Sequence, residues 1–483
     1  MKTNFISSLL LFVSASAFAQ TKKVLPPKPV YPVPSAQQLA WHEMETNAFV
    51  HFTTNTFTDK EWGYGDEKES VFNPSQLNAK QWAKTLKNAG FKTMILTCKH
   101  HDGFCLWPSK YTEHSVKNSP YKNGKGDVVK EASEAAKKYG LHFGVYLSPW
   151  DRNQATYGTP AYIEYYRNQL KELFTHYGKV TEMWFDGANG GDGYYGGKRE
   201  ARKINGATYY DWPTTLKMIS KIQPGVLFFS DAGPGLRWVG NERGMAGETN
   251  WNTITPDTLF AGKGGIEDLL NTGSADGTKW IPAEVDVSIR PGWFYHSSED
   301  DKVKTPQQLF DIYLSSVGRG STLLLNIPPD RRGLFHENDV KSLEGFQQLL
   351  HKELGNNLAK NANATATNYR GKSKQFAAAN LTDGNKKTYW ATDDNVIKAS
   401  VEIDLKKTTT VKYILLQEYI QLGQRVKSFT VEIWKDDEWQ QVAAATTIGY
   451  KRILKIEPVI TNKVRVNILE AKASPVLTNV ALY

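Results

Sequence analysis

Short apolar runs alternate with amphipathic stretches over the first 350 residues of this chain. The apolar runs have the length of buried strands, and they lie at 48–52, 93–98, 142–147, 181–186, 226–230, 282–287 and 322–326. The stretches between and after them have helical periodicity, and they lie at 79–89, 128–139, 160–177, 213–222, 306–317 and 338–350. Repeated alternation of strand and helix predicts a parallel sheet in a domain of the α/β class.

The number of strands favours a closed barrel over an open sheet. Seven strands are visible, and the irregular region 231–280 has room for an eighth. No glycine-rich phosphate-binding motif follows any of these strands, which removes the usual reason to expect an open nucleotide-binding sheet. We therefore expect a (β/α)8-type barrel over residues 20–355.

The pattern changes after residue 355. A polar stretch at 356–374 is followed by short alternating segments such as 399–405 and 428–434, with no helical periodicity between them. Such a pattern is typical of a β-sandwich. We expect a separate all-β domain at 356–483.

The first residues have the composition of a secretory signal peptide. Lys2 supplies a positive charge, residues 5–18 are mainly apolar, and Ala17 and Ala19 form a cleavage pattern before Gln20. We expect residues 1–19 to be removed and the protein to be exported, either to the periplasm or into the medium. No later stretch reaches about 18 consecutive apolar residues, so no membrane insertion is expected.

Charge, cysteine and aromatic content narrow the partners. The net charge of +9 is spread along the chain without a strong basic block, which argues against nucleic acid. Cys98 and Cys105 are the only cysteines, and export leaves both a disulfide and two free thiols open. The chain is rich in aromatic residues, with 14 Trp, 23 Tyr and 21 Phe, and aromatic faces suit the C–H faces of sugars, although we expect most of these rings to lie in the core.

Polar and aromatic residues follow the ends of the predicted strands. In a barrel these ends meet at one face, where active sites lie. The residues in question are His51 and Glu61 after the first strand, His100 and His101 after the second, Trp150 after the third, Asp186 after the fourth, Glu242 after the fifth and Trp293 after the sixth.

Histidines beside an acid also fit a metal site. His100, His101 and Asp102 are common ligand types, so a metal-dependent hydrolase is an alternative. The spacing matches neither H-x-H nor H-E-x-x-H, and no catalytic metal is predicted. Asp102 and Asp151 fit structural roles better, as helix caps or as the partner of Arg152.

Two carboxyl groups facing one pocket fit the hydrolysis of a glycosidic bond. One protonates the leaving oxygen while the other attacks the sugar or activates water. Asp186 and Glu242 are the candidates. Carboxyl groups about 5–5.5 Å apart indicate retention of configuration, and about 6.5–9.5 Å apart indicate inversion.

The combined motifs resemble the α-L-fucosidases of glycoside hydrolase family 29. The matching segments are Val50-His51-Phe52, Glu61-Trp62-Gly63, Lys99-His100-His101-Asp102-Gly103-Phe104, Trp184-Phe185-Asp186-Gly187 and Gly240-Asn241-Glu242. The resemblance implies a retaining exo-hydrolase that removes terminal α-linked L-fucose from glycans and requires no cofactor. It also implies that Asp186 is the nucleophile. The residues that it implies for the sugar hydroxyls are His51, Glu61, His100 and His101, with Trp293 near the sugar's methyl face and Trp150 as a weaker match.

The acid/base residue has two candidates. The segment from Arg237 to Glu242 resembles that of the family branch acting on α-1,3/1,4-fucosyl linkages, which implies Glu242. Glu248, six residues later, is the rival. A broad-specificity fucosidase is the alternative to this branch, and a non-catalytic carbohydrate-binding protein is an alternative to an enzyme.

The C-terminal domain resembles discoidin-like modules, on the residues Leu381-Thr382-Asp383-Gly384-Asn385 and Thr388-Tyr389-Trp390. The resemblance implies either sugar binding or a supporting role beside the barrel. It also implies a structural Ca²⁺ at the first segment, since that cation prefers oxygen ligands. The oligomeric state stays open.

Overall fold

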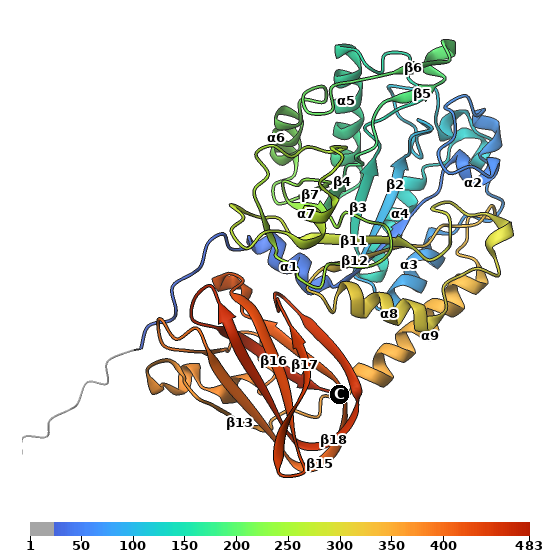
Figure 1. Ribbon diagram of the computed structural model, residues 1–483. Coiled ribbons are helices and arrows are strands. Elements are labelled where there is room, and N and C mark those ends of the chain that lie inside the picture. Colours follow the sequence, from blue (N-terminus) through green and yellow to red (C-terminus); the bar gives the residue numbers. More distant parts are fainter. Residues whose placement is uncertain (1–23) are drawn as a thin grey trace, which may run out of the picture.

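Eight parallel strands close into a barrel in the N-terminal part of the computed structural model, which describes residues 24–483 (Figure 1). The predicted signal peptide lies outside the described residues. The strands follow the circular order β1-β12-β11-β8-β7-β4-β3-β2. They are β1 (Thr46–Val50), β2 (Thr93–Lys99), β3 (His142–Leu147), β4 (Glu182–Trp184), β7 (Leu227–Ser230), β8 (Leu236–Trp238), β11 (Ala283–Ser288) and β12 (Thr322–Asn326).

This arrangement confirms the predicted barrel. Strands β3 and β12 have the predicted bounds, and β8 is the eighth strand, inside the region 231–280 that the pattern left irregular. Strand β4 ends at Trp184, two residues before Asp186, so that Asp186 stands free of the hydrogen-bonded ladder.

The helices surround the barrel. They are α1 (Ala36–Met44), α2 (Thr54–Thr58), α3 (Ala79–Asn88), α4 (Val128–Tyr139), α5 (Pro160–His176), α6 (Trp212–Ile222), α7 (Glu267–Thr272), α8 (Pro306–Ser316) and α9 (Glu337–Leu354). Of these, α3, α4, α5, α6, α8 and α9 match the six predicted helical stretches, whereas α1, α2 and α7 were not predicted. Local sequence fixes their ends: Asn78 and Asp127 cap the first turns of α3 and α4, and Thr305 and Gln308 form a capping box at α8. In the part of the chain that is described, none of these helices has the length and apolar character needed to cross a membrane.

The barrel interior is aromatic at the level just below the strand ends. Trp184 on β4 stacks on Phe229 on β7 with ring centroids 4.1 Å apart, and Phe49 on β1 packs against Trp184. These rings fill the barrel beneath the strand ends. Polar groups at the strand ends therefore lie above a packed apolar layer.

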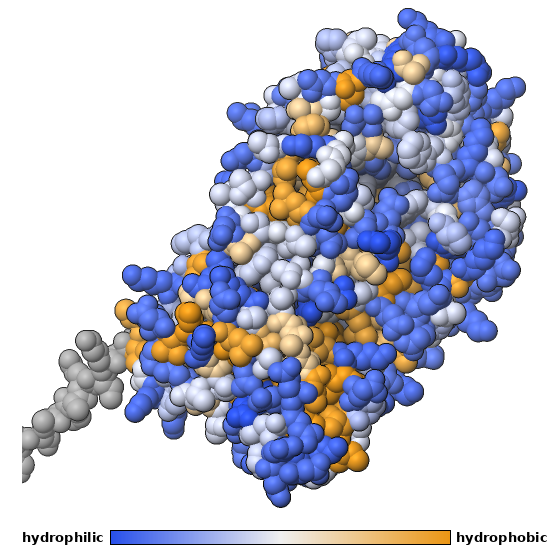
Figure 2. Space-filling view, viewed as in Figure 1, coloured by the Kyte–Doolittle hydropathy of each residue, from blue (hydrophilic) through white to orange (hydrophobic). Residues whose placement is uncertain are grey.

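The C-terminal domain is antiparallel and all-β, as predicted. Its strands are β13 (Asn363–Ala366), β14 (Trp390–Ala391), β15 (Ala399–Glu418), β16 (Val426–Lys435), β17 (Glu438–Ala445), β18 (Arg452–Ala471) and β19 (Val476–Leu482). It has its own apolar core, which includes Trp390. On the face seen in Figure 2 the barrel is mainly hydrophilic, and the broadest hydrophobic areas lie over the C-terminal domain and its junction with the barrel.

The structure bears on two expectations, a disulfide between the cysteines and a calcium site in the C-terminal domain. Cys98 and Cys105 are free and buried, so of the two alternatives for these cysteines the disulfide is wrong. At the predicted calcium segment, the Asp383 carboxylate accepts hydrogen bonds from the Asn385 amide at 2.7 Å and the Thr388 hydroxyl at 2.7 Å. Its two oxygens thus close a local turn, and the geometry gives the calcium prediction no support.

Candidate active site

A cavity of about 250 Å³ opens at the carboxyl ends of the barrel strands. Its wall brings together six of the residues predicted from the sequence. They are His51, His100, His101, Asp186, Glu242 and Trp293. Because these residues follow the ends of five different strands, with His100 and His101 both after β2, the closed barrel itself creates this convergence.

His51 is held in place by the last strand of the barrel. Its Nδ1 forms a 2.8 Å hydrogen bond with the Asn326 side-chain oxygen at the end of β12. Burial lowers the pKa of His51 to about 3, against the opposing effect of this hydrogen bond. The ring is therefore neutral at neutral pH and offers one nitrogen to a ligand.

His101 has a tautomer that its neighbours determine. The Ser148 hydroxyl donates to the Trp150 carbonyl at 2.6 Å, so it accepts from Nδ1–H of His101 at 2.7 Å. Burial lowers the pKa of both His101 and His100. The Nε2 lone pair of His101 faces the cavity side and can accept a hydrogen bond from a sugar hydroxyl.

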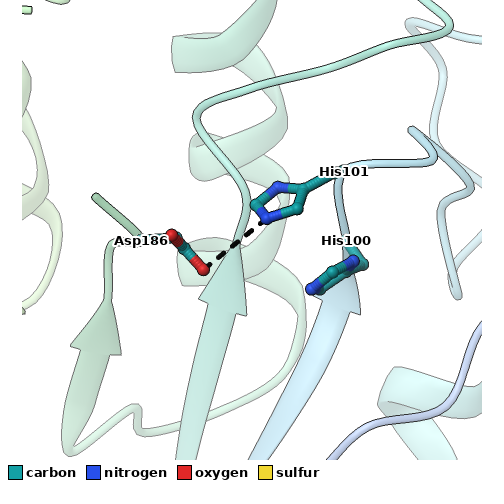
Figure 3. Close-up of side chains that lie close together, drawn as sticks. All are labelled: His100, His101 and Asp186. Atoms are coloured by element: carbon teal, nitrogen blue, oxygen red, sulfur yellow. Dashed lines mark ion pairs between the residues drawn. The ribbon is translucent and has the colours of Figure 1, made fainter. Parts of the chain in front are cut away.

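Asp186 points at His101, with its Oδ2 atom 3.8 Å from Nε2 (Figure 3). Oδ2 also accepts a 3.0 Å hydrogen bond from the Tyr146 hydroxyl, and Oδ1 accepts one of 2.7 Å from the Ala188 amide. The next position requires glycine, because a Cβ at Gly187 would lie 2.0 Å from the Asp231 carboxylate. The Asp186 side chain is 24% exposed, so an oriented carboxylate stays open to the cavity.

Glu242 follows β8 and reaches the same cavity. Its Oε2 accepts a 3.1 Å hydrogen bond from the Trp293 indole. Burial raises the pKa of Glu242, and the charges of Asp186 and Glu61 raise it further. Glu248 lies outside the cavity, where its 79% exposed side chain pairs with Arg319 at 3.2 Å.

Trp150 and Glu61 lie outside the wall of this cavity, and the substrate contact predicted for each stays a prediction. Trp150 is 3% exposed because Trp62 and the hairpin of β5 (Gly191–Gly193) and β6 (Glu200–Arg202) cover it. Its ring supports His101 at a centroid distance of 5.2 Å. The Glu61 carboxylate accepts hydrogen bonds from the Trp293 amide at 2.8 Å and the Phe294 amide at 3.1 Å, so it holds the Trp293 loop.

Several residues of the site were missed. Tyr146 could have been found from alternation within β3, which turns every second side chain into the barrel. Asp231 stands directly after β7, as the other acids follow their strands. Trp238 lies in the segment from Arg237 to Glu242, and Asp286 lies in the apolar run 282–287. The Asp286 carboxylate accepts a 2.9 Å hydrogen bond from the Trp238 indole. Trp62 also lines the cavity.

The site has a partial metal-ligand set. His100, His101 and Asp186 offer donor atoms within 4.8 Å of one another, the one such group of His, Cys, Asp and Glu found among residues 24–483. Two imidazoles and a carboxylate suit Zn²⁺. However, the buried Nδ1 of His100 has no hydrogen-bond partner, whereas a metal-binding histidine normally donates from its second nitrogen. The set fits a metal only in part.

Comparison with known proteins places both domains. The family model described as Alpha-L-fucosidase matches residues 29–354, and the F5/8 type C domain model matches residues 362–480. Alpha-L-fucosidase 1 of Arabidopsis thaliana is 41% identical over 98% of this chain and 92% of its own length.

Solved structures agree with the sequence relatives. A glycoside hydrolase 29 family member from an unknown rumen bacterium is 44% identical, with a TM-score of 0.85 over 95% of this chain and 78% of that chain. A Ruminococcus gnavus GH29 fucosidase in complex with fucose is 33% identical, with a TM-score of 0.87 over 96% of this chain and 97% of that one. With its barrel, its cavity and its C-terminal F5/8 type C domain, the chain belongs to the glycoside hydrolase family 29 α-L-fucosidases.

Proposed function

We propose that the protein is a retaining exo-α-L-fucosidase that removes terminal α-1,3/1,4-linked L-fucose from fucosylated oligosaccharides or glycoconjugates. The observation that carries the proposal is the pair of differently placed carboxyl groups in one cavity. Asp186 is held by two hydrogen-bond donors and open to ligand. Glu242 keeps an exposed side chain at the cavity, where partial desolvation and the charges of Asp186 and Glu61 raise its pKa and favour its protonated form. Because the two environments differ in this way, we assign Asp186 as the nucleophile and Glu242 as the acid.

In the first step, an Asp186 carboxylate oxygen forms a bond to C1 of fucose as the glycosidic C–O bond breaks. Glu242 gives its proton to the leaving oxygen, so the aglycone departs as a neutral alcohol. In the second step, Glu242 takes a proton from water while that water oxygen attacks C1 and releases Asp186. Fucose leaves with its original anomeric configuration.

The neutral histidines bind the fucose hydroxyls in this proposal. His51, His100 and His101 each have a ring nitrogen available in the cavity because burial keeps the imidazoles uncharged. Trp293 and Trp62 supply apolar faces for the sugar ring.

The linkage preference is supported by the segment from Arg237 to Glu242, which resembles that of the α-1,3/1,4 branch. The test compares an aryl α-L-fucoside, a Lewis-type trisaccharide and an α-1,2-linked fucosyl oligosaccharide. We expect hydrolysis of the first two and little of the third, with α-L-fucose as the first product seen by NMR. Equal rates on the α-1,2 linkage would favour a broad-specificity enzyme, and β-L-fucose as the first product would exclude retention.

Export is part of the same proposal, supported by the apolar segment and cleavage pattern of residues 1–19. The mature protein isolated from its native cell envelope or medium should begin at Gln20. A chain that keeps Met1 and stays in the cell interior would contradict export.

A further inference from the structure

The loop that carries Glu242 continues into a segment, 246–252, that rests against the C-terminal domain. We propose that the C-terminal domain positions the acid/base residue, with Gln424 and Thr447 as the positioning residues. The inference rests on the proposed role of Glu242. Under this proposal the C-terminal domain contributes to catalysis by positioning Glu242, which a carbohydrate-binding role would not require.

Gln424 makes the central contact between the two domains. Its Oε1 accepts hydrogen bonds from the backbone amide and the side-chain amide of Asn252, at 2.9 and 3.0 Å. Its Nε2 donates to the Asn250 carbonyl at 2.9 Å. The side chain is 3% exposed, so three hydrogen bonds shielded from water fix the path of 250–252.

Two further C-terminal residues hold the same segment. The Thr447 hydroxyl accepts from the Asn250 amide at 2.8 Å. The Arg452 guanidinium donates to the Glu248 carbonyl at 2.6 Å. The segment is therefore bound at residues 248, 250 and 252 by the neighbouring domain.

The contacting loops of the C-terminal domain are themselves held together by one buried carboxylate. Glu418, which is 2% exposed, accepts from the amides of Arg425, Val426 and Gly449, at 2.7, 2.9 and 2.8 Å. These three amides flank Gln424 and Thr447. The domain thus presents a preformed surface to the barrel.

The barrel connects the same segment back to the strand before Glu242. Arg237 on β8 is fully buried and donates to the Trp251 carbonyl at 2.9 Å and the Asn250 side chain at 3.3 Å. Between Glu242 and residues 248–252, the Arg319 guanidinium donates a 2.8 Å hydrogen bond to the Ala246 carbonyl. Within residues 24–483, the Glu242 side chain has a single hydrogen-bond partner, Trp293, so its position depends on the backbone of its loop, which continues into this network.

A displaced acid has a distinctive kinetic effect. General acid catalysis contributes about 10²- to 10⁴-fold, and a shift of about 1 Å can cost about 10²-fold. An aryl fucoside with an activated leaving group needs little protonation, whereas a sugar leaving group needs it fully. Loss of positioning therefore lowers turnover of oligosaccharides selectively, while simple destabilisation lowers both activities together.

The test uses the full chain with Gln424→Ala, and Thr447→Val as a nearly isosteric second variant. We expect kcat/KM on a Lewis-type trisaccharide to fall at least about tenfold while that on an activated aryl α-L-fucoside stays within about twofold. Lys451→Ala is the control, because the Lys451 side chain makes another interdomain contact, the 2.5 Å pair with Glu45, and no hydrogen bond or ion pair with residues 246–252. It should change the two activities by the same factor.

Glu242→Ala, assayed in parallel, separates the two proposals. If it shows the selective loss and both interdomain variants do not, the positioning role is overturned and the acid/base role stands. If Glu242→Ala shows no selective loss, the acid/base assignment fails, and the positioning role fails with it. An equal loss on both substrates in Gln424→Ala and Thr447→Val also overturns the positioning role.

Discussion

The indole nitrogen of Trp293 donates a 3.1 Å hydrogen bond to Oε2 of Glu242 across the mouth of the cavity. This bond stabilises the charged carboxylate and opposes the rise in the pKa of Glu242 that burial and the Asp186 charge produce. The proton that Glu242 donates is therefore available over a pH range that depends on Trp293.

Trp293→Phe removes the donor and should raise the pKa of Glu242 further. Because catalysis requires the protonated acid, the alkaline limb of the kcat/KM profile should move to higher pH. The measurement is a pH profile on an oligosaccharide substrate. Trp238→Phe is the control, since that indole donates to Asp286, and its alkaline limb should not rise. An alkaline limb that moves to lower pH in Trp293→Phe would contradict the assignment of the proton to Glu242.

Tyr146→Phe should lower kcat/KM about 10- to 100-fold, because a hydrogen bond to a charged group is worth about 1.5–3 kcal/mol. The lost bond is the 3.0 Å contact with Asp186. The assay is hydrolysis of an aryl α-L-fucoside. Tyr166→Phe is a matched control, since its buried hydroxyl donates to the Leu147 carbonyl at 2.7 Å and not to Asp186. Similar rates for both variants would remove Tyr146 from the catalytic machinery.

Lys99→Met should destabilise the barrel by about 3–5 kcal/mol, because it leaves the Asp151 carboxylate buried without its cation. The two side chains are 0% and 1% exposed, and Nζ lies 2.9 Å from Oδ2. Denaturant unfolding followed by tryptophan fluorescence measures the change. Lys117→Met, which breaks an exposed pair with Glu113, should cost less than about 1 kcal/mol. An equal loss of unfolding free energy in the two variants would mean that burial of the Lys99–Asp151 pair does not increase its contribution to stability.

Prolonged treatment with a chelator should leave fucosidase activity unchanged. The proposed chemistry uses Asp186 and Glu242, and His100 lacks the outer hydrogen-bond partner expected of a zinc ligand. Activity before and after treatment, with elemental analysis of the same sample, gives the answer. Activity that is lost with the chelator and restored by Zn²⁺ would revive the metal-dependent hydrolase built on His100 and His101.

The sequence was sufficient for the barrel and for much of its cavity. Strand ends are local features, and the closure of parallel strands then brings His51, His100 and Asp186 together without further information. Strand β8 was hidden because it has three residues, one of them the buried Arg237, and so lacks an apolar run. Sequence also ranked Glu242 above Glu248, and only the former lines the cavity.

Residues in long loops could not be placed in the same way. Trp150 follows a strand end, but the hairpin of β5 and β6, far along the chain, covers it. Glu61 faces the amides of Trp293 and Phe294, more than 200 positions away in the sequence. Such contacts depend on how loops pack over the barrel, which no local pattern encodes. Neither did any pattern show that Gln424 would meet Asn252 across the domain boundary.

The most direct test of the proposed mechanism is kcat/KM of Asp186→Ala on an aryl α-L-fucoside, with circular dichroism and the unfolding midpoint confirming that the fold is kept. If Asp186 forms the covalent bond to fucose, activity should fall by at least about 10³-fold, because the substitution removes the attacking carboxylate that Tyr146 and the Ala188 amide orient. Activity within tenfold of the parent enzyme would contradict the assignment of Asp186 as nucleophile.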